Sequence, residues 1–85
     1  MAKTRKSKRP RKRKIILRHR RVIGDAIRFY RRRNHLTQET LAEKAELNPK
    51  YLGEVERGEK IISIEALLRI SQSLRTPIHK FLQKV

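Results

Sequence analysis

Apolar residues recur at helical spacing in several short segments of this 85-residue chain. Ile23, Ile27 and Tyr30 fall at positions i, i+4 and i+7, which share one face of a helix. The other expected helices lie within residues 37–45, 48–58, 63–74 and 76–85. No segment alternates between apolar and polar residues as a half-buried strand does. The pattern therefore predicts an all-α fold of five short helices.

Capping residues mark where these helices begin. Thr37, Asn48 and Ser63 each precede a helical segment and can accept a hydrogen bond from a free N–H group of its first turn. Pro49 fits the first helical position because proline lacks the N–H that is unpaired there, and Gly58 is a typical C-terminal cap. The second and third helices are therefore expected to have about eight residues each and to be joined by a turn of about three.

Basic residues dominate the composition, and half of them lie at the N-terminus. The chain has 24 Lys and Arg residues against 8 Asp and Glu residues, a net charge of +16. Residues 1–21 hold 12 of the basic residues and none of the acidic ones. We expect residues 1–14 to be a disordered basic arm and residues 15–85 to form one domain, because like charges repel and the arm lacks apolar periodicity. Such an arm favours polyanions, since neutralising phosphates releases counterions, although a solubilising tail has the same composition.

Several classes of function are disfavoured by what the sequence lacks. It has no cysteine and its three histidines are not spaced like metal ligands, so we expect neither a disulfide nor a metal site. No apolar run approaches the roughly 18 residues of a membrane span. No serine is placed with a histidine and an acid as in a hydrolase. We therefore expect a cytoplasmic protein that is not an enzyme, with no cofactor, no membrane association and no small-molecule effector.

Two short motifs stand in the middle of the chain. Leu36-Thr37-Gln38 opens the second expected helix, and Glu56-Arg57-Gly58 closes the third. With these motifs, residues 23–82 resemble the XRE family of helix-turn-helix proteins, which includes the phage Cro and C1 repressors. The stretch Tyr51-Leu52-Gly53-Glu54-Val55-Glu56-Arg57-Gly58, with Ile62-Ser63, also resembles the controller proteins of restriction–modification systems. The resemblance implies a five-helix, lambda-repressor-like domain that binds DNA.

The resemblance also implies roles for individual residues. The third helix would be the recognition helix, which enters the major groove of DNA. Its DNA-facing positions correspond to Asn48, Pro49, Lys50, Tyr51, Gly53, Glu54 and Arg57. Phosphate contacts are expected from Thr37, Gln38, Arg32 and Arg33. Arg31 and Glu56 correspond to the family's structural ion pair, which links the first helix to the end of the third.

Four positions depart from the family pattern or admit two interpretations. His35 and Glu46 stand where family members carry glycine, and a positive φ at either would cost of order 1 kcal/mol. Gly53 lies inside the recognition helix, where it either lets DNA approach closely or is simply tolerated. Tyr51 either contacts DNA or packs against a neighbouring helix.

We therefore expect a transcription regulator that binds a specific double-stranded DNA sequence as a homodimer. The apolar residues that suggest a dimer patch, unless they complete the core of one chain, are Ile61, Ile62, Phe81 and Val85. Two recognition helices related by two-fold symmetry can read half-sites about one DNA turn apart. Two alternatives stay open, namely an RNA- or ribosome-associated adaptor and an antitoxin-like protein-interaction module on the same fold.

Overall fold

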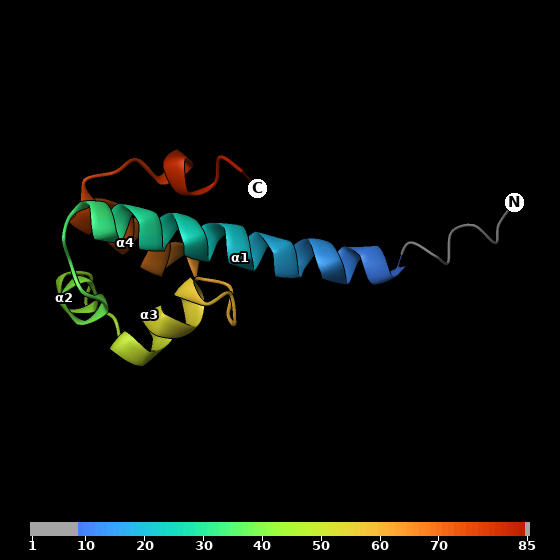
Figure 1. Ribbon diagram of the computed structural model, residues 1–85, viewed down its shortest axis with the longest axis horizontal. Coiled ribbons are helices and arrows are strands. Elements are labelled where there is room, and N and C mark those ends of the chain that lie inside the picture. Colours follow the sequence, from blue (N-terminus) through green and yellow to red (C-terminus); the bar gives the residue numbers. More distant parts are fainter. Residues whose placement is uncertain (1–8, 85) are drawn as a thin grey trace, which may run out of the picture.

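The computed structural model describes residues 9–84, which form four α-helices and one turn of 3-10 helix (Figure 1). The elements are α1 (Arg9–Arg33), α2 (Gln38–Lys44), α3 (Pro49–Glu56), α4 (Ile64–Leu74) and η2 (Ile78–Phe81). The predicted all-α class is confirmed. None of the helices in the described part of the chain is both long enough and apolar enough to cross a membrane.

The fifth predicted helix is the 3-10 turn η2 rather than an α-helix. Ile78 packs against the core and Phe81 is buried in it, while Leu82 is largely exposed. A 3-10 turn has three residues per turn, so it places positions i and i+3 on the same side. Ile78 and Phe81 therefore both reach the core from a single turn, and a longer helix would gain little from Leu82.

Helix α1 begins earlier than the sequence suggested. The expected disordered arm covered residues 1–14, but residues 9–14 belong to α1, and residues 1–8 lie outside the described residues. Pro10 suits the first turn of a helix, and lysine and arginine are good helix formers, so helical structure continues through this basic stretch. Figure 1 shows this part of α1 (blue) extending well beyond the other helices.

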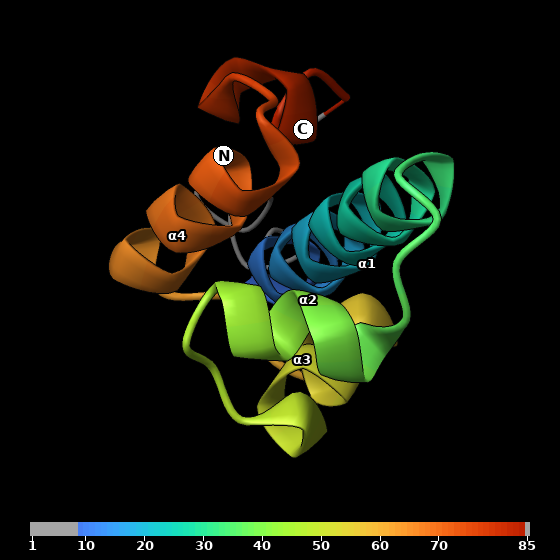
Figure 2. The same cartoon turned by 90° about the vertical axis from the view of Figure 1, so that its left-hand side faces the viewer.

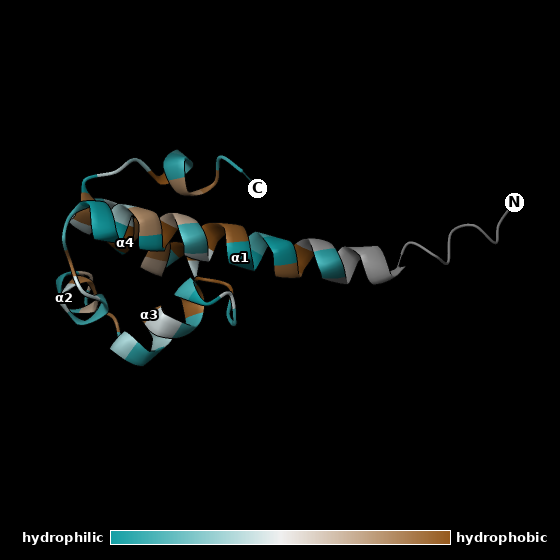
Figure 3. Ribbon diagram, in the orientation of Figure 1, coloured by the Kyte–Doolittle hydropathy of each residue, from teal (hydrophilic) through white to brown (hydrophobic). Residues whose placement is uncertain are grey.

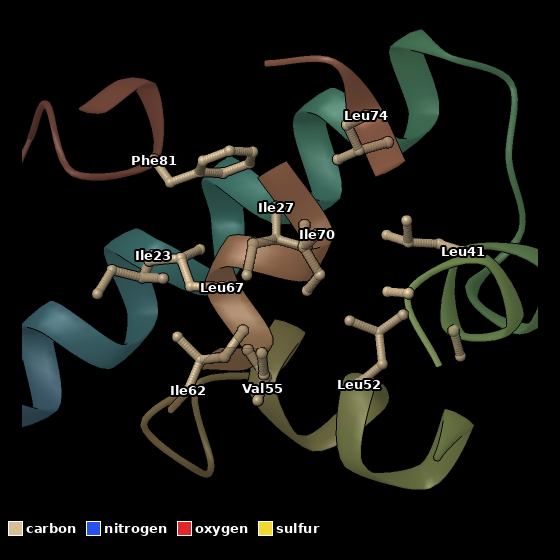
Figure 4. Packing of buried hydrophobic residues seen from close by; sticks show 13 residues of the cluster. Ile23, Ile27, Leu41, Leu52, Val55, Ile62, Leu67, Ile70, Leu74 and Phe81 are labelled. Carbon is tan, nitrogen blue, oxygen red and sulfur yellow. The ribbon is translucent and has the colours of Figure 1, made fainter. Parts of the chain in front are cut away.

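The hydrophobic core lies where all four α-helices and η2 meet (Figure 4), with Leu41 and Ala42 contributed by α2. Ile27, Leu52, Ile70 and Phe81 are completely buried there. Apolar and polar bands alternate along α1 (Figure 3), and its projecting part carries two exposed apolar residues, Ile16 and Leu17. Helix α1 makes its most extensive contacts with α3, which fixes the orientation of α3 relative to the rest of the molecule.

The residues expected to form a dimer patch divide between core and surface. Ile62 and Phe81 are buried within the single chain, so their assignment to an exposed patch is wrong. Ile61 is 50% exposed, and Val85 lies outside the described residues. Ile62 packs in the same cluster as Ile23, because the loop between α3 and α4 runs back beneath α1.

The predicted caps form hydrogen bonds to the helices they precede. Thr37 Oγ1 accepts from the N–H of Thr40 at 3.0 Å, and Asn48 Oδ1 accepts from the N–H of Lys50 at 2.7 Å. Ser63 Oγ accepts from the third residue of its helix at 3.1 Å. Each such cap contributes about 1 kcal/mol.

Three non-glycine residues adopt the left-handed backbone conformation. His35 and Glu46 have φ values of 58° and 57°, as expected if they replace glycine in the turns that follow α1 and α2. Arg75, with φ 51°, occupies the same position after α4 and was not anticipated. Each residue ends a helix with a conformation that costs of order 1 kcal/mol without glycine.

Candidate nucleic-acid interface

Helices α2 and α3 are joined by a tight turn, and α3 projects from the body with its N-terminus foremost (Figures 1 and 2). Leu52 and Val55 face inward and are fully buried. Asn48, Pro49 and Lys50, at the start of α3, are exposed. The projecting end of α3 is therefore accessible, and the major groove of B-DNA is wide enough to admit such a helix.

A buried carboxylate holds the back of α3 against α1. Glu56 is 1% exposed and Arg31 is 8% exposed. Arg31 Nε donates to Glu56 Oε2 at 2.7 Å, and its Nη2 donates to Oε1 at 3.0 Å. The structure thus brings together the two residues that the resemblance paired, in the bidentate geometry that makes such a pair strong.

Two further side chains complete the surroundings of Glu56. Arg28 Nη2 donates to the backbone carbonyl of Glu56 at 3.0 Å, and Arg28 Nε lies 3.6 Å from Glu56 Oε1. Gln38 Nε2 donates to Oε1 at 2.9 Å. Sequence reasoning missed Arg28, although its position one turn before Arg31 places both on the same face of α1. Glu56 therefore ties α1, α2 and α3 together at a single point.

Gly53 is buried beneath the side chains of Gln38 and Arg57, where α2 and α3 meet. A Cβ atom at Gly53 would lie 3.1 Å from Arg57 Nη1 and 3.4 Å from Gln38 Oε1. The missing side chain lets these two polar groups come close together over the middle of α3. Gln38 is an expected phosphate contact and Arg57 belongs to the expected DNA-facing set, and the structure places the two side by side.

Two of the cations near α3 are paired with neighbouring carboxylates. Arg57 Nε donates to Glu59 Oε2 at 2.8 Å, and this hydrogen bond raises the pKa of Arg57 and lowers the pKa of Glu59. Lys60 Nζ lies 3.3 Å from Glu54 Oε1. Lys50 belongs to none of the ion pairs found among the described residues, so its ammonium group is available to a ligand.

Tyr51 is half-buried and packs against the core. Its hydroxyl accepts a hydrogen bond from the N–H of Ser63 at 3.0 Å, which ties α3 to the start of α4. This contact favours the packing interpretation of Tyr51.

The expected phosphate contacts do not all lie beside α3. Thr37 precedes α2 next to Gln38, and its hydroxyl forms the cap described above. Arg32 and Arg33 are exposed and line a hollow along α1 together with Asp25, Phe29 and Arg28, the residue that donates to the Glu56 carbonyl. No residue of α3 lines that hollow.

Charge is distributed unevenly between α1 and the rest of this interface. Helix α1 carries 12 basic residues and one acidic residue, a net charge of +11. Residues 37–65, which span α2, α3 and the loop into α4, carry four basic and seven acidic residues, a net charge of −3. Among the residues that the structure describes, no three histidine, cysteine or acidic side chains are grouped so that they could hold a metal ion.

The arrangement of α1 to η2 is shared with known regulators. The HTH_3 helix-turn-helix family matches residues 27–81. The chain is 35% identical over 63 residues to the control protein C.SmaI of Serratia marcescens, covering 74% of this chain and 75% of that protein.

Solved structures of regulators also share this arrangement of helices. The restriction–modification controller protein C.AhdI of Aeromonas hydrophila superposes with a TM-score of 0.71 and 31% identity, over 73% of this chain and 94% of that one. The clp gene regulator ClgR of Corynebacterium glutamicum gives a TM-score of 0.74 and 33% identity, over 78% and 70% of the two chains. The family is one of regulators and not of enzymes. The chain belongs to the XRE-type helix-turn-helix family of DNA-binding transcription regulators.

Proposed function

We propose that this regulator recognises a specific double-stranded DNA sequence by placing α3 in the major groove. The observation that carries the proposal is the Glu56 cluster, which fixes the back of α3 to α1 and α2 and leaves Asn48, Pro49 and Lys50 exposed. A helix that is held rigidly at one end and projects at the other can present side chains to base edges in a fixed register.

Individual residues then divide between bases and phosphates. Lys50 donates to guanine O6 and N7, and Glu54 accepts from cytosine N4 once it leaves Lys60. Arg57 binds a phosphate beside Gly53, and Gln38 adds the second hydrogen of Nε2, whose first hydrogen is bonded to Glu56. The remaining members of the proposed DNA-facing set are Asn48, Pro49, Tyr51, Gly53 and Thr37. Arg32 and Arg33 line a hollow that no residue of α3 lines, and they are left out of this set.

The protein acts as a homodimer in this proposal. Ile61, Ile64 and Leu68 are exposed at the start of α4, by 50%, 71% and 48%. Ile64 and Leu68 are four residues apart and share one face of the helix, next to Ile61. An isologous contact between two such apolar faces pairs two copies of α3 for adjacent half-sites. Sedimentation that finds only monomer at concentrations well above those that saturate DNA contradicts the dimer.

The relatives' names suggest what the regulator serves. C.SmaI is a control protein and C.AhdI is a controller of a restriction–modification system. We extend that role to this chain, as a cytoplasmic protein that acts on the promoter of such a system. The role predicts that the selected DNA motif lies upstream of genes for a methyltransferase and an endonuclease.

Selection of bound duplexes from a random-sequence library at near-physiological salt tests the proposal. The expected result is a two-fold symmetric motif with half-sites about 10 base pairs apart. Lys50→Ala serves as the matched variant, and we expect it to lose preference at one base of each half-site. Strong binding without an enriched motif, or tighter binding to structured RNA than to the selected duplex, overturns sequence-specific DNA recognition.

A further inference from the structure

Helix α1 and the C-terminal segment enclose a groove, which we call the α1–C-terminal groove. Val22, Ala26 and Phe29 line it from α1, and Phe81 and Gln83 line it from the C-terminal segment. The rings of Phe29, Tyr30 and Phe81 form a row of edge-to-face contacts, with centroids 4.9 and 5.4 Å apart. Phe29 is 54% exposed although it belongs to this aromatic row.

The groove and α3 lie on opposite flanks of α1. Gly24 packs against the backbone of Val55 near the end of α3, whereas Ala26 lines the groove. Two residues of a helix separate side chains by about 200° around its axis. Figures 1 and 2 both show the C-terminal segment on one side of α1 and α3 on the other. The α1–C-terminal groove therefore stays accessible when α3 is bound in the major groove of DNA.

The apolar floor of the groove is bordered by basic side chains. Lys80 and Lys84 line it directly, and Arg32 and Arg33 line an adjoining hollow that shares Phe29 and Asp25 with it. Asp25 is the one carboxylate among these lining residues, so the four cations outnumber it. None of these four cations takes part in an ion pair within the described part of the chain. The guanidinium of Arg33 lies 5.9 Å from the centre of the Phe29 ring.

We infer that the α1–C-terminal groove binds an acidic amphipathic helix of a partner protein. An apolar ridge of that helix packs on Val22, Ala26 and Phe29, and its flanking carboxylates meet Lys80, Lys84 and the two arginines. DNA satisfies the cations but leaves the apolar floor uncovered. A second copy of the same groove brings like charges together. An acidic amphipathic helix satisfies both features and goes beyond DNA binding, because it docks a second protein on the face away from DNA.

The test uses the full-length chain and a designed probe. The probe is a peptide of about 18 residues, roughly five helical turns, with leucine at every third or fourth position and glutamate at most others. A second peptide has the same composition in scrambled order. Amide chemical-shift changes in the isotope-labelled protein report where each peptide binds, with and without the selected duplex.

Binding of the patterned peptide is expected at Val22, Ala26, Phe29 and Lys80, with and without bound duplex. Phe29→Glu is expected to weaken this binding roughly tenfold or more, since it removes an aromatic anchor and adds a repelling carboxylate. Ile16→Glu makes the same charge change at a similarly exposed apolar residue of α1 that does not line the groove, so it leaves peptide binding unchanged and serves as the control.

Two outcomes overturn the inference. One is that the two peptides bind equally well, or that Phe29→Glu binds both DNA and the patterned peptide as tightly as the unaltered protein does. Either result means that net charge alone attracts the peptide. Displacement of the peptide by duplex DNA, with DNA-induced shifts at Val22 and Phe29, assigns the groove to nucleic acid.

Discussion

Helix α1 and the helix-turn-helix segment, residues 37–65, pack against each other but have opposite charge. The net charge is +11 on α1 and −3 on residues 37–65. The segment that presents α3 is therefore repelled by phosphates as a whole, and the attraction comes from its neighbour. Attraction to phosphates is independent of sequence, whereas contacts to base edges carry the sequence information. In the proposed complex with DNA, the two regions thus divide affinity and specificity between them.

The paired side chains around α3 support this division. Glu54 lies beside Lys60, and Glu59 lies beside Arg57, so carboxylates offset two of the cations nearest to the proposed DNA-facing side of α3. A wrong sequence that offers only phosphates gains little from such cations. The specific DNA sequence can form new hydrogen bonds with Glu54 or Arg57, and these bonds compensate for the ion pair that is broken.

Glu56→Ala is expected to have the largest effect, because Glu56 joins the two regions. It leaves Arg31 buried without its carboxylate, and breaking a buried pair from one side costs about 3–5 kcal/mol. Urea unfolding with an unchanged m-value measures the loss in the free energy of unfolding. Glu65→Ala is the control, since its pair with Arg69 is exposed and worth about 0.5 kcal/mol. Equal losses for the two variants contradict the central role of Glu56.

Gly24→Ala tests how closely the two regions approach. A Cβ atom at Gly24 would lie 2.3 Å from the carbonyl oxygen of Val55, so α1 and α3 must move apart. Overpacking of this kind costs about 1–3 kcal/mol in the free energy of unfolding. Gly53→Ala is the matched variant, because its nearest neighbour is the flexible end of Arg57 and alanine favours a helix. Thermal unfolding that ranks Gly53→Ala below Gly24→Ala contradicts this interpretation of the contact.

Local features of this fold could be read from the sequence, whereas features that depend on tertiary approach could not. The caps at Thr37, Asn48 and Ser63 were predictable because a cap bonds to N–H groups within its own next turn. The left-handed backbone conformation at Glu46 could be anticipated because the family that the sequence resembles has glycine at this position. Arg75 has the same conformation but gave no signal, because no expected glycine marked its position.

The same distinction applies to the candidate interface. The pair between Arg31 and Glu56 was implied by the resemblance, but the bond from Arg28 to the Glu56 carbonyl exists only because α1 meets α3 at Gly24. The helical start of α1 was missed because net charge alone suggested disorder in a stretch whose residues are good helix formers. The proposed base contacts of α3 stay predictions.

The third prediction separates affinity from specificity. Lys50→Ala is expected to cost about 1–3 kcal/mol on the selected duplex and to leave binding to unrelated duplexes nearly unchanged. The triple variant Lys14→Ala, Arg18→Ala, Arg21→Ala is expected to weaken binding to all duplexes alike. The logarithm of the association constant falls as the logarithm of the salt concentration rises. In the triple variant we expect this dependence to be less steep, by about 0.9 for each lost phosphate contact. Titrations at several salt concentrations measure both effects, and a loss of sequence preference in the triple variant contradicts the division between the two regions.

The smallest expected effect comes from Glu46→Gly, in the turn between α2 and α3. Glu46 has φ 57°, and its exposed side chain takes part in no ion pair found among the described residues. Glycine removes the left-handed penalty of about 1–2 kcal/mol but adds about 0.4–1 kcal/mol of unfolded-chain entropy. A net gain of about 0.5–1 kcal/mol in the free energy of unfolding follows. Glu46→Ala keeps the backbone penalty and isolates it. A glycine variant less stable than the alanine variant shows that the turn stores no strain, and an altered DNA preference shows that the turn positions α3.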